Sequence, residues 1–140
     1  MLRRPRATAL LASATFLALV ACGGSSGDGT QSKSVRIILG HLRFAPSSVT
    51  VEAGTTVRFV LANSDAIDHE FVLGSEDVQN EHARMRMGGG HMMDSSGAVS
   101  VPPSKTVELT HTFDEPGTVL YGCHVADHYE QGMKGTVTVT

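Results

Sequence analysis

One segment near the C-terminus concentrates side chains that bind soft metal ions. Cys123, His128 and Met133 follow one another as Cys-x4-His-x4-Met. A strand-like stretch ends at the cysteine, and another begins just after the methionine. A loop held at both ends by strands of one sandwich can direct three side chains to a single point. We therefore expect these three residues to converge on one metal ion.

A fourth ligand must come from elsewhere, and His69 is the candidate because it begins another strand-like stretch, 69–73. Two imidazoles and a thiolate with a weak axial thioether form the ligand set of type 1, or blue, copper sites. Zinc fits less well, because a thioether is not among its usual ligands. We predict a mononuclear copper site at His69, Cys123, His128 and Met133 that transfers single electrons.

Cys123 and a histidine could also belong to a cysteine hydrolase. However, no carboxylate or carboxamide is recognisable that would orient the histidine, and Met133 would then have no role. We therefore predict that the protein is not an enzyme.

The first 21 residues have the features of a bacterial export signal. Three arginines precede an apolar run, 9–21, that is too short for a stable membrane helix. Leu19-Val20-Ala21-Cys22 resembles the lipobox of bacterial lipoproteins, in which the cysteine becomes the lipid-modified first residue. The alternative is an ordinary signal peptide cut nearby, with Cys22 as a stray thiol. We expect a membrane-anchored lipoprotein that faces the periplasm or the cell exterior.

The chain has two cysteines, so lipidation of Cys22 would leave Cys123 without a disulfide partner. An unpaired thiol outside the cytoplasm is exposed to oxidation. Metal ligation explains why Cys123 is there.

The remaining sequence divides into a tether and one domain. Residues 22–34 are rich in Gly, Ser and polar side chains, as in a flexible tether, and residues 35–140 form the domain. Short alternating segments such as 56–61 and 107–113 predict an all-β sandwich. In the latter segment His111 falls on the apolar face, so we expect it to be half-buried. Residues 75–87 lack alternation and predict a short helix or loop insertion.

The charge excludes one class of partner. The chain has 11 basic and 14 acidic residues, and removal of a signal with three arginines makes the mature chain more negative. A mildly acidic surface argues against nucleic acid as a partner. We expect a monomer whose partner is a redox protein or a copper-handling protein.

A family resemblance extends over the whole domain. The motifs that carry it are Phe44-x-Pro46, Val49-x-Val51-x-x-Gly54, Val57-x-Phe59, His69, Tyr121-x-Cys123 and Met133-x-Gly135-Thr136-Val137. They resemble the cupredoxins, the family of plastocyanin, azurin and rusticyanin. The resemblance implies a Greek-key β-sandwich with one type 1 copper. The segment from His69 to Gly74 and the insertion after it resemble a bacterial branch of the family associated with copper handling.

Two features near the predicted site leave its use open. Glu70 would stabilise Cu(II) and lower the reduction potential if its carboxylate faced the copper, whereas strand alternation equally permits it to face solvent. A set of His and Met residues, the His/Met set, does not follow the periodicity of a strand or a helix face. These residues are a candidate second site for Cu(I), or else they belong to a mobile loop whose methionines cover the hydrophobic rim of the first copper site. This set consists of His82, Met85, Met87, His91, Met92 and Met93.

Two functions remain. The first is a one-electron carrier, which rests on the four ligands. The second is a copper sequestration or tolerance protein, which rests on the His/Met set.

Overall fold

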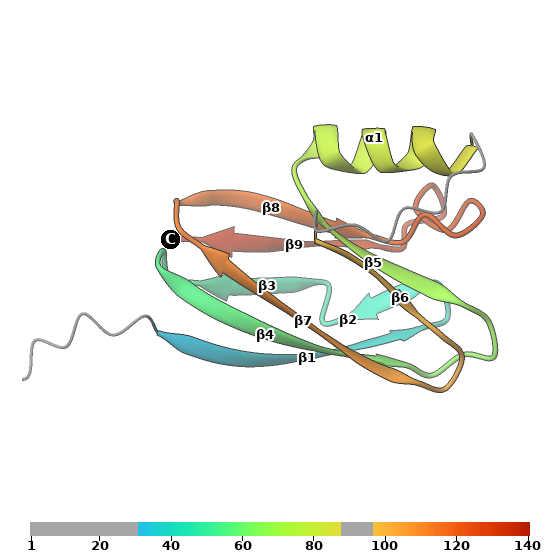
Figure 1. Ribbon diagram of the computed structural model, residues 1–140, viewed down its shortest axis with the longest axis horizontal. Coiled ribbons are helices and arrows are strands. Elements are labelled where there is room, and N and C mark those ends of the chain that lie inside the picture. Colours follow the sequence, from blue (N-terminus) through green and yellow to red (C-terminus); the bar gives the residue numbers. More distant parts are fainter. Residues whose placement is uncertain (1–30, 88–96) are drawn as a thin grey trace, which may run out of the picture.

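The computed structural model describes residues 31–87 and 97–140 (Figure 1). The predicted signal peptide and most of the tether lie outside these ranges. So do four residues with predicted roles, namely Cys22, His91, Met92 and Met93.

In the described part of the chain, two β-sheets face each other across a common core, and one helix lies outside them (Figure 1). The four-stranded sheet has the order β2 (Arg43–Ala45), β1 (Ser32–Gly40), β4 (Thr55–Asn63) and β7 (Thr106–Phe113). The five-stranded sheet has the order β3 (Ser48–Val51), β9 (Lys134–Val139), β8 (Gly117–Gly122), β5 (His69–Gly74) and β6 (Ala98–Val101). The predicted all-β sandwich is confirmed.

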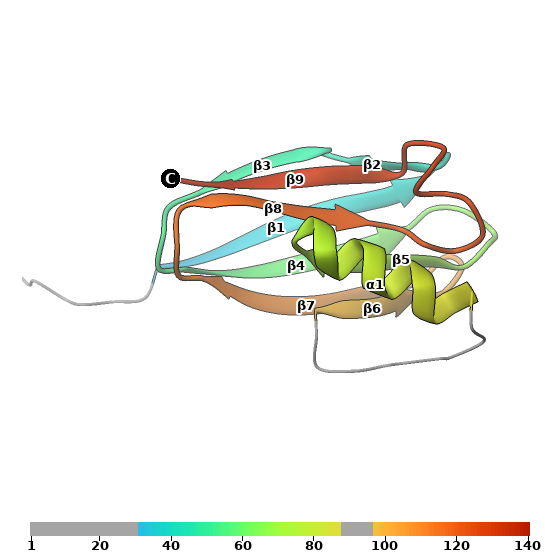
Figure 2. The same ribbon diagram turned by 90° about the horizontal axis from the view of Figure 1, so that it is seen from above.

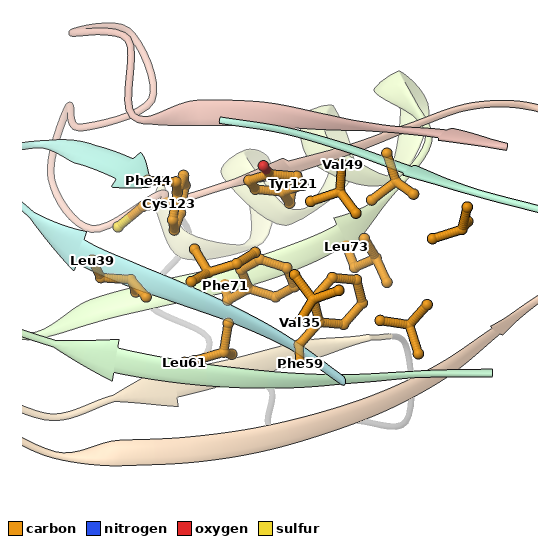
Figure 3. Close-up of a cluster of buried hydrophobic side chains, with 14 of the residues drawn as sticks. Val35, Leu39, Phe44, Val49, Phe59, Leu61, Phe71, Leu73, Tyr121 and Cys123 are labelled. Carbon is orange, nitrogen blue, oxygen red and sulfur yellow. The ribbon is translucent and has the colours of Figure 1, made fainter. Parts of the chain in front are cut away.

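Strand alternation builds the core. In β4 the side chains of Val57, Phe59 and Leu61 are fully buried, while Arg58 between them is exposed. Aromatic rings from both sheets meet in the middle, where the ring centroid of Phe59 in β4 is 5.3 Å from that of Phe71 in β5. Phe71 also stacks on Tyr121 of β8, in its own sheet, with ring centroids 5.2 Å apart. Figure 3 shows this cluster, with Cys123 at one end of it. The predicted ligand Cys123 is therefore part of the buried core.

The insertion between β5 and β6 contains a helix, α1 (Glu76–Met87), that covers the outer face of the five-stranded sheet over β5 and β8 (Figure 2). Ser75 precedes it, and its hydroxyl accepts a hydrogen bond from the Val78 N–H at 3.4 Å, as a helix N-cap does. Acidic residues occupy the first turn and arginines the last, which suits the helix dipole. The structure thus selects the helix from the two predicted forms of this segment.

Two details differ from the sequence-based expectations. Strand β1 begins at Ser32 and pairs in parallel with β4, so the β-sandwich includes residues of the predicted tether. His111 is exposed rather than half-buried. It lies in β7, at the edge of its sheet, where the imidazole packs against the Phe113 ring at the rim instead of entering the core.

Candidate metal centre

Three of the predicted ligands meet at one end of the sandwich. His69 is the first residue of β5, Cys123 directly follows β8, and His128 lies in the loop between β8 and β9. The Cys123 Sγ is 3.7 Å from the His69 Nδ1 and 3.5 Å from the His128 Nδ1, and all three side chains are buried. Ligands about 2.0–2.3 Å from one ion in a trigonal arrangement would lie roughly 3.6 Å apart. The donor set therefore fits a single copper ion.

Met133 belongs to the same loop and is fully buried. Its carbonyl accepts a hydrogen bond from the Cys123 N–H at 3.1 Å, and its own N–H donates to the His128 carbonyl at 2.9 Å. These bonds tie the backbone of all three loop residues together. The role of the Met133 thioether as an axial ligand stays a prediction.

Asp65 orients the first histidine. The Nε2 atom of His69 lies 3.0 Å from the Asp65 Oδ2, so the imidazole donates its Nε2 proton and keeps the Nδ1 lone pair towards Cys123. This hydrogen bond lowers the pKa of the Asp65 carboxyl, which stays ionised. The backbone N–H of His41 also donates to Asp65, at 2.8 Å. Sequence analysis missed this residue; the available signal was a carboxylate four residues before a candidate ligand.

The thiol of Cys123 is protonated when no ion is bound. Burial raises its pKa to about 11, so without a metal it is protonated at neutral pH. Burial also lowers the pKa of His128, which favours the neutral imidazole that a metal requires. The backbone N–H of Glu70 donates to the Cys123 Sγ at 3.3 Å. Ion binding must therefore displace one proton, from the cysteine.

Glu70 takes neither of the two predicted orientations. Its carboxylate lies on the face of β5 opposite to His69, where Oε2 is 3.2 Å from the His82 Nε2 and Oε1 contacts the Arg86 guanidinium. The side chain is only 14% exposed. Glu70 reaches the metal centre through its backbone N–H, while its carboxylate binds α1.

The His/Met set is only partly described. His82 lies in α1 and bonds to Glu70, whereas Met85 and Met87 are exposed on the same helix. Within residues 31–87 and 97–140, the His69, Cys123 and His128 group is the one cluster of at least three His, Cys or acidic side chains close enough to share an ion. The second copper site remains a prediction.

The sequence matches a family model described as copper-binding proteins of the plastocyanin/azurin family, over residues 31–140. The chain belongs to this family. The recognition of a cupredoxin and the prediction of copper as its cofactor are thereby confirmed.

This cupredoxin is similar to proteins of two kinds, copper-resistant cuproproteins and a blue copper protein of known structure. It is 37% identical to the copper-resistant cuproprotein CopI of Rubrivivax gelatinosus, over 83% of this chain and 72% of that one. It is 33% identical to CopI of Pseudomonas aeruginosa, over 77% and 76%. Among solved structures, the blue copper protein auracyanin A of Chloroflexus aurantiacus superposes with a TM-score of 0.66 at 29% identity, over 78% of this chain and 99% of that one.

The residues that the structure describes contain no candidate membrane-spanning helix. No helix there has both the length and the apolar character needed to cross a bilayer.

Proposed function

We propose that this cupredoxin transfers single electrons outside the cytoplasm through a type 1 copper held by His69, Cys123, His128 and Met133. The observation that carries the proposal is the convergence of two imidazole Nδ1 atoms and one thiol on a point between β5 and the loop after β8. Bound copper supplies a one-electron couple between Cu(I) and Cu(II).

The protein's contribution is a prearranged ligand set. Asp65 fixes the tautomer of His69, and the Glu70 N–H fixes the position of the sulfur. Because ligands held this way move little between oxidation states, the reorganisation on electron transfer stays small. The buried core behind Cys123 excludes water from one side of the site.

An absorption spectrum of the protein loaded with one equivalent of Cu(II) tests the proposal. We expect an intense sulfur-to-copper charge-transfer band in the red that disappears in Cys123→Ser, which replaces the sulfur by oxygen. Asp68→Asn serves as a control, because this exposed residue of the loop before β5 should leave the band in place. A colourless Cu(II) protein, or a Cys123→Ser variant with full colour, contradicts the proposal.

A second candidate function is copper tolerance by sequestration or transfer of the metal. The relatives named copper-resistant favour it, and so does the His/Met set. In this alternative the protein binds further Cu(I) through thioethers. Titration with Cu(I) distinguishes the functions by stoichiometry. More than one copper per chain, reduced to one by replacing Met85, Met87, Met92 and Met93 with leucine, supports tolerance, and one copper in both proteins refutes a second site.

Export and membrane anchoring through Cys22 complete the proposal. The support is the lipobox-like sequence that ends at this residue. Cell fractionation should find the wild-type protein in the membrane fraction. Cys22→Ser should release it or leave it unprocessed. If the variant is processed to the same length as the wild type and still fractionates with the membrane, the anchor is refuted.

A further inference from the structure

Helix α1 contacts the residue that follows each of two ligands. Glu70 follows His69 and bonds to His82 and Arg86 of the helix. His124 follows Cys123 and bonds to Gln79 of the helix. Successive side chains of an extended chain point to opposite faces of the sheet. Because the ligands His69 and Cys123 face the core, the residue that follows each of them faces the helix.

The contact at Glu70 is a shielded charge pair. The carboxylate is 14% exposed and the Arg86 side chain 30%, whereas the Arg84–Glu81 pair on the same helix is 68% and 53% exposed. An ion pair withdrawn from water is screened less and constrains its partners more than an exposed one. His82 adds a hydrogen bond to the other carboxylate oxygen. The Glu70 side chain is thus held at both oxygens.

The contact at His124 is made by a buried amide. Gln79 is 1% exposed; its Nε2 donates to the Val72 carbonyl of β5 at 2.8 Å, and its Oε1 is 2.8 Å from the His124 Nε2. The His124 ring in turn stacks on Tyr129 of the ligand loop, with centroids 4.5 Å apart. One glutamine therefore connects the strand of the first ligand to the residue beside the cysteine.

Gly122 makes this close approach feasible. A Cβ at this position would collide with the Tyr129 ring and with the Gln79 side chain. The chain therefore has glycine directly before Cys123, where the helix and the ligand loop pack on the end of β8.

The contact at Glu70 reaches the cysteine sulfur. The Glu70 N–H donates to Sγ at 3.3 Å, and this N–H belongs to the residue whose side chain Arg86 and His82 hold. A hydrogen bond to a ligating sulfur withdraws electron density from it, which favours Cu(I) and raises the reduction potential.

We propose that α1 is a positioning element of the metal centre, in which Arg86 and His82 hold Glu70 so that its N–H remains on the Cys123 sulfur. This inference rests on the proposed copper site and assigns to the insertion helix the tuning of its potential. Arg86, His82 and Gln79 are positioning residues, since they act through Glu70 and His124.

The test compares Arg86→Gln with Arg84→Gln. Both remove one arginine from the last turn of α1, but only Arg86 contacts Glu70. In the metal-free protein, amide exchange measured by NMR should be about tenfold faster at Glu70 in Arg86→Gln, as for the loss of one ordinary hydrogen bond. It should be unchanged in Arg84→Gln. The copper-loaded Arg86→Gln protein should have a lower reduction potential and a shifted charge-transfer band.

Glu70→Gln gives a second and independent measurement, because the amide keeps the shape of the side chain. Loss of the negative charge alone would raise the potential, whereas loss of positioning lowers it and speeds Glu70 amide exchange. Unchanged exchange in both Arg86→Gln and Glu70→Gln, or an equal change in Arg84→Gln, overturns the inference. A wild-type protein without the charge-transfer band refutes the proposed function instead, and the exchange rates of the metal-free protein still report on the helix.

Discussion

Replacement of Asp65 by alanine should weaken copper binding without removing any ligand. The change deletes the acceptor that lies 3.0 Å from the His69 Nε2 and 2.8 Å from the His41 backbone N. His69 then loses the partner that fixes its tautomer, so part of the population presents a protonated Nδ1 to the site. Rotation of the ring also becomes less restricted, because the bond held one end of it.

The size of the effect follows from the exposure of the carboxylate. Loss of a residue that orients a metal-binding histidine typically costs 10–100-fold in affinity. The Asp65 side chain is 19% exposed, so water can replace the lost acceptor in part. We therefore expect Asp65→Ala to lose copper affinity at the lower end of this range, about tenfold or roughly 1.4 kcal/mol. Asp65→Asn keeps an oxygen acceptor and should lose only about twofold to threefold.

Competition with a chromophoric chelator at fixed pH measures this affinity for each oxidation state. Asp68→Ala is the matched control, because it removes an exposed carboxylate from the same loop, directly before His69. Wild-type affinity in Asp65→Ala, or an equal loss in Asp68→Ala, would refute the reasoning. The second result would assign the effect to the general negative charge of the loop rather than to a hydrogen bond.

Three further predictions concern the axial ligand, the thiol and the core. Met133→Leu should raise the reduction potential and speed the loss of copper, as followed by voltammetry and chelator competition; an unchanged potential argues against an axial role. Copper binding should release one proton at neutral pH, because burial raises the pKa of the Cys123 thiol to about 11. The apparent affinity should therefore rise about tenfold per pH unit, and calorimetry in buffers of different ionisation enthalpy that detects no proton would contradict this. Phe71→Ala should lower the free energy of unfolding by about 3–5 kcal/mol in urea titrations, since the ring is fully buried between Phe59 and Tyr121. A loss below about 1 kcal/mol would mean that the core collapses around the gap.

The sequence was sufficient to predict those features of the fold and the site that depend on neighbouring residues in the chain. Alternation predicted the strands, and the Cys-x4-His-x4-Met spacing between two of them predicted the loop whose cysteine and histidine the structure brings together. His69 could be predicted as a ligand for the same reason, because it begins a strand-like stretch. Composition also predicted the position of the insertion that forms α1.

The sequence was insufficient where a role depends on distant contacts. Gln79 is buried because α1 folds back over two strands, and its partner His124 is 45 residues away in the chain. Glu70 could not be oriented, because alternation places it away from the core but cannot foresee that a helix covers that face. The prediction for His111 failed in the opposite direction. A position on the apolar face of a strand is buried only where neighbouring elements cover it, and His111 lies in β7 at the edge of the four-stranded sheet.

The hydrogen bond between the Cys123 N–H and the Met133 carbonyl closes the ligand loop at its base, so the loop has a frame fixed by the sheet and an interior that the sheet does not hold. The frame consists of the ends of β8 and β9, which pair up to Gly122 and Lys134 and hold both residues whatever lies between them. Residues 124–132 form a cassette within that frame. Changes in the length of the cassette would move His128 while the cysteine and methionine stay in place, so a single short loop could adjust the metal's coordination without any change in the sandwich.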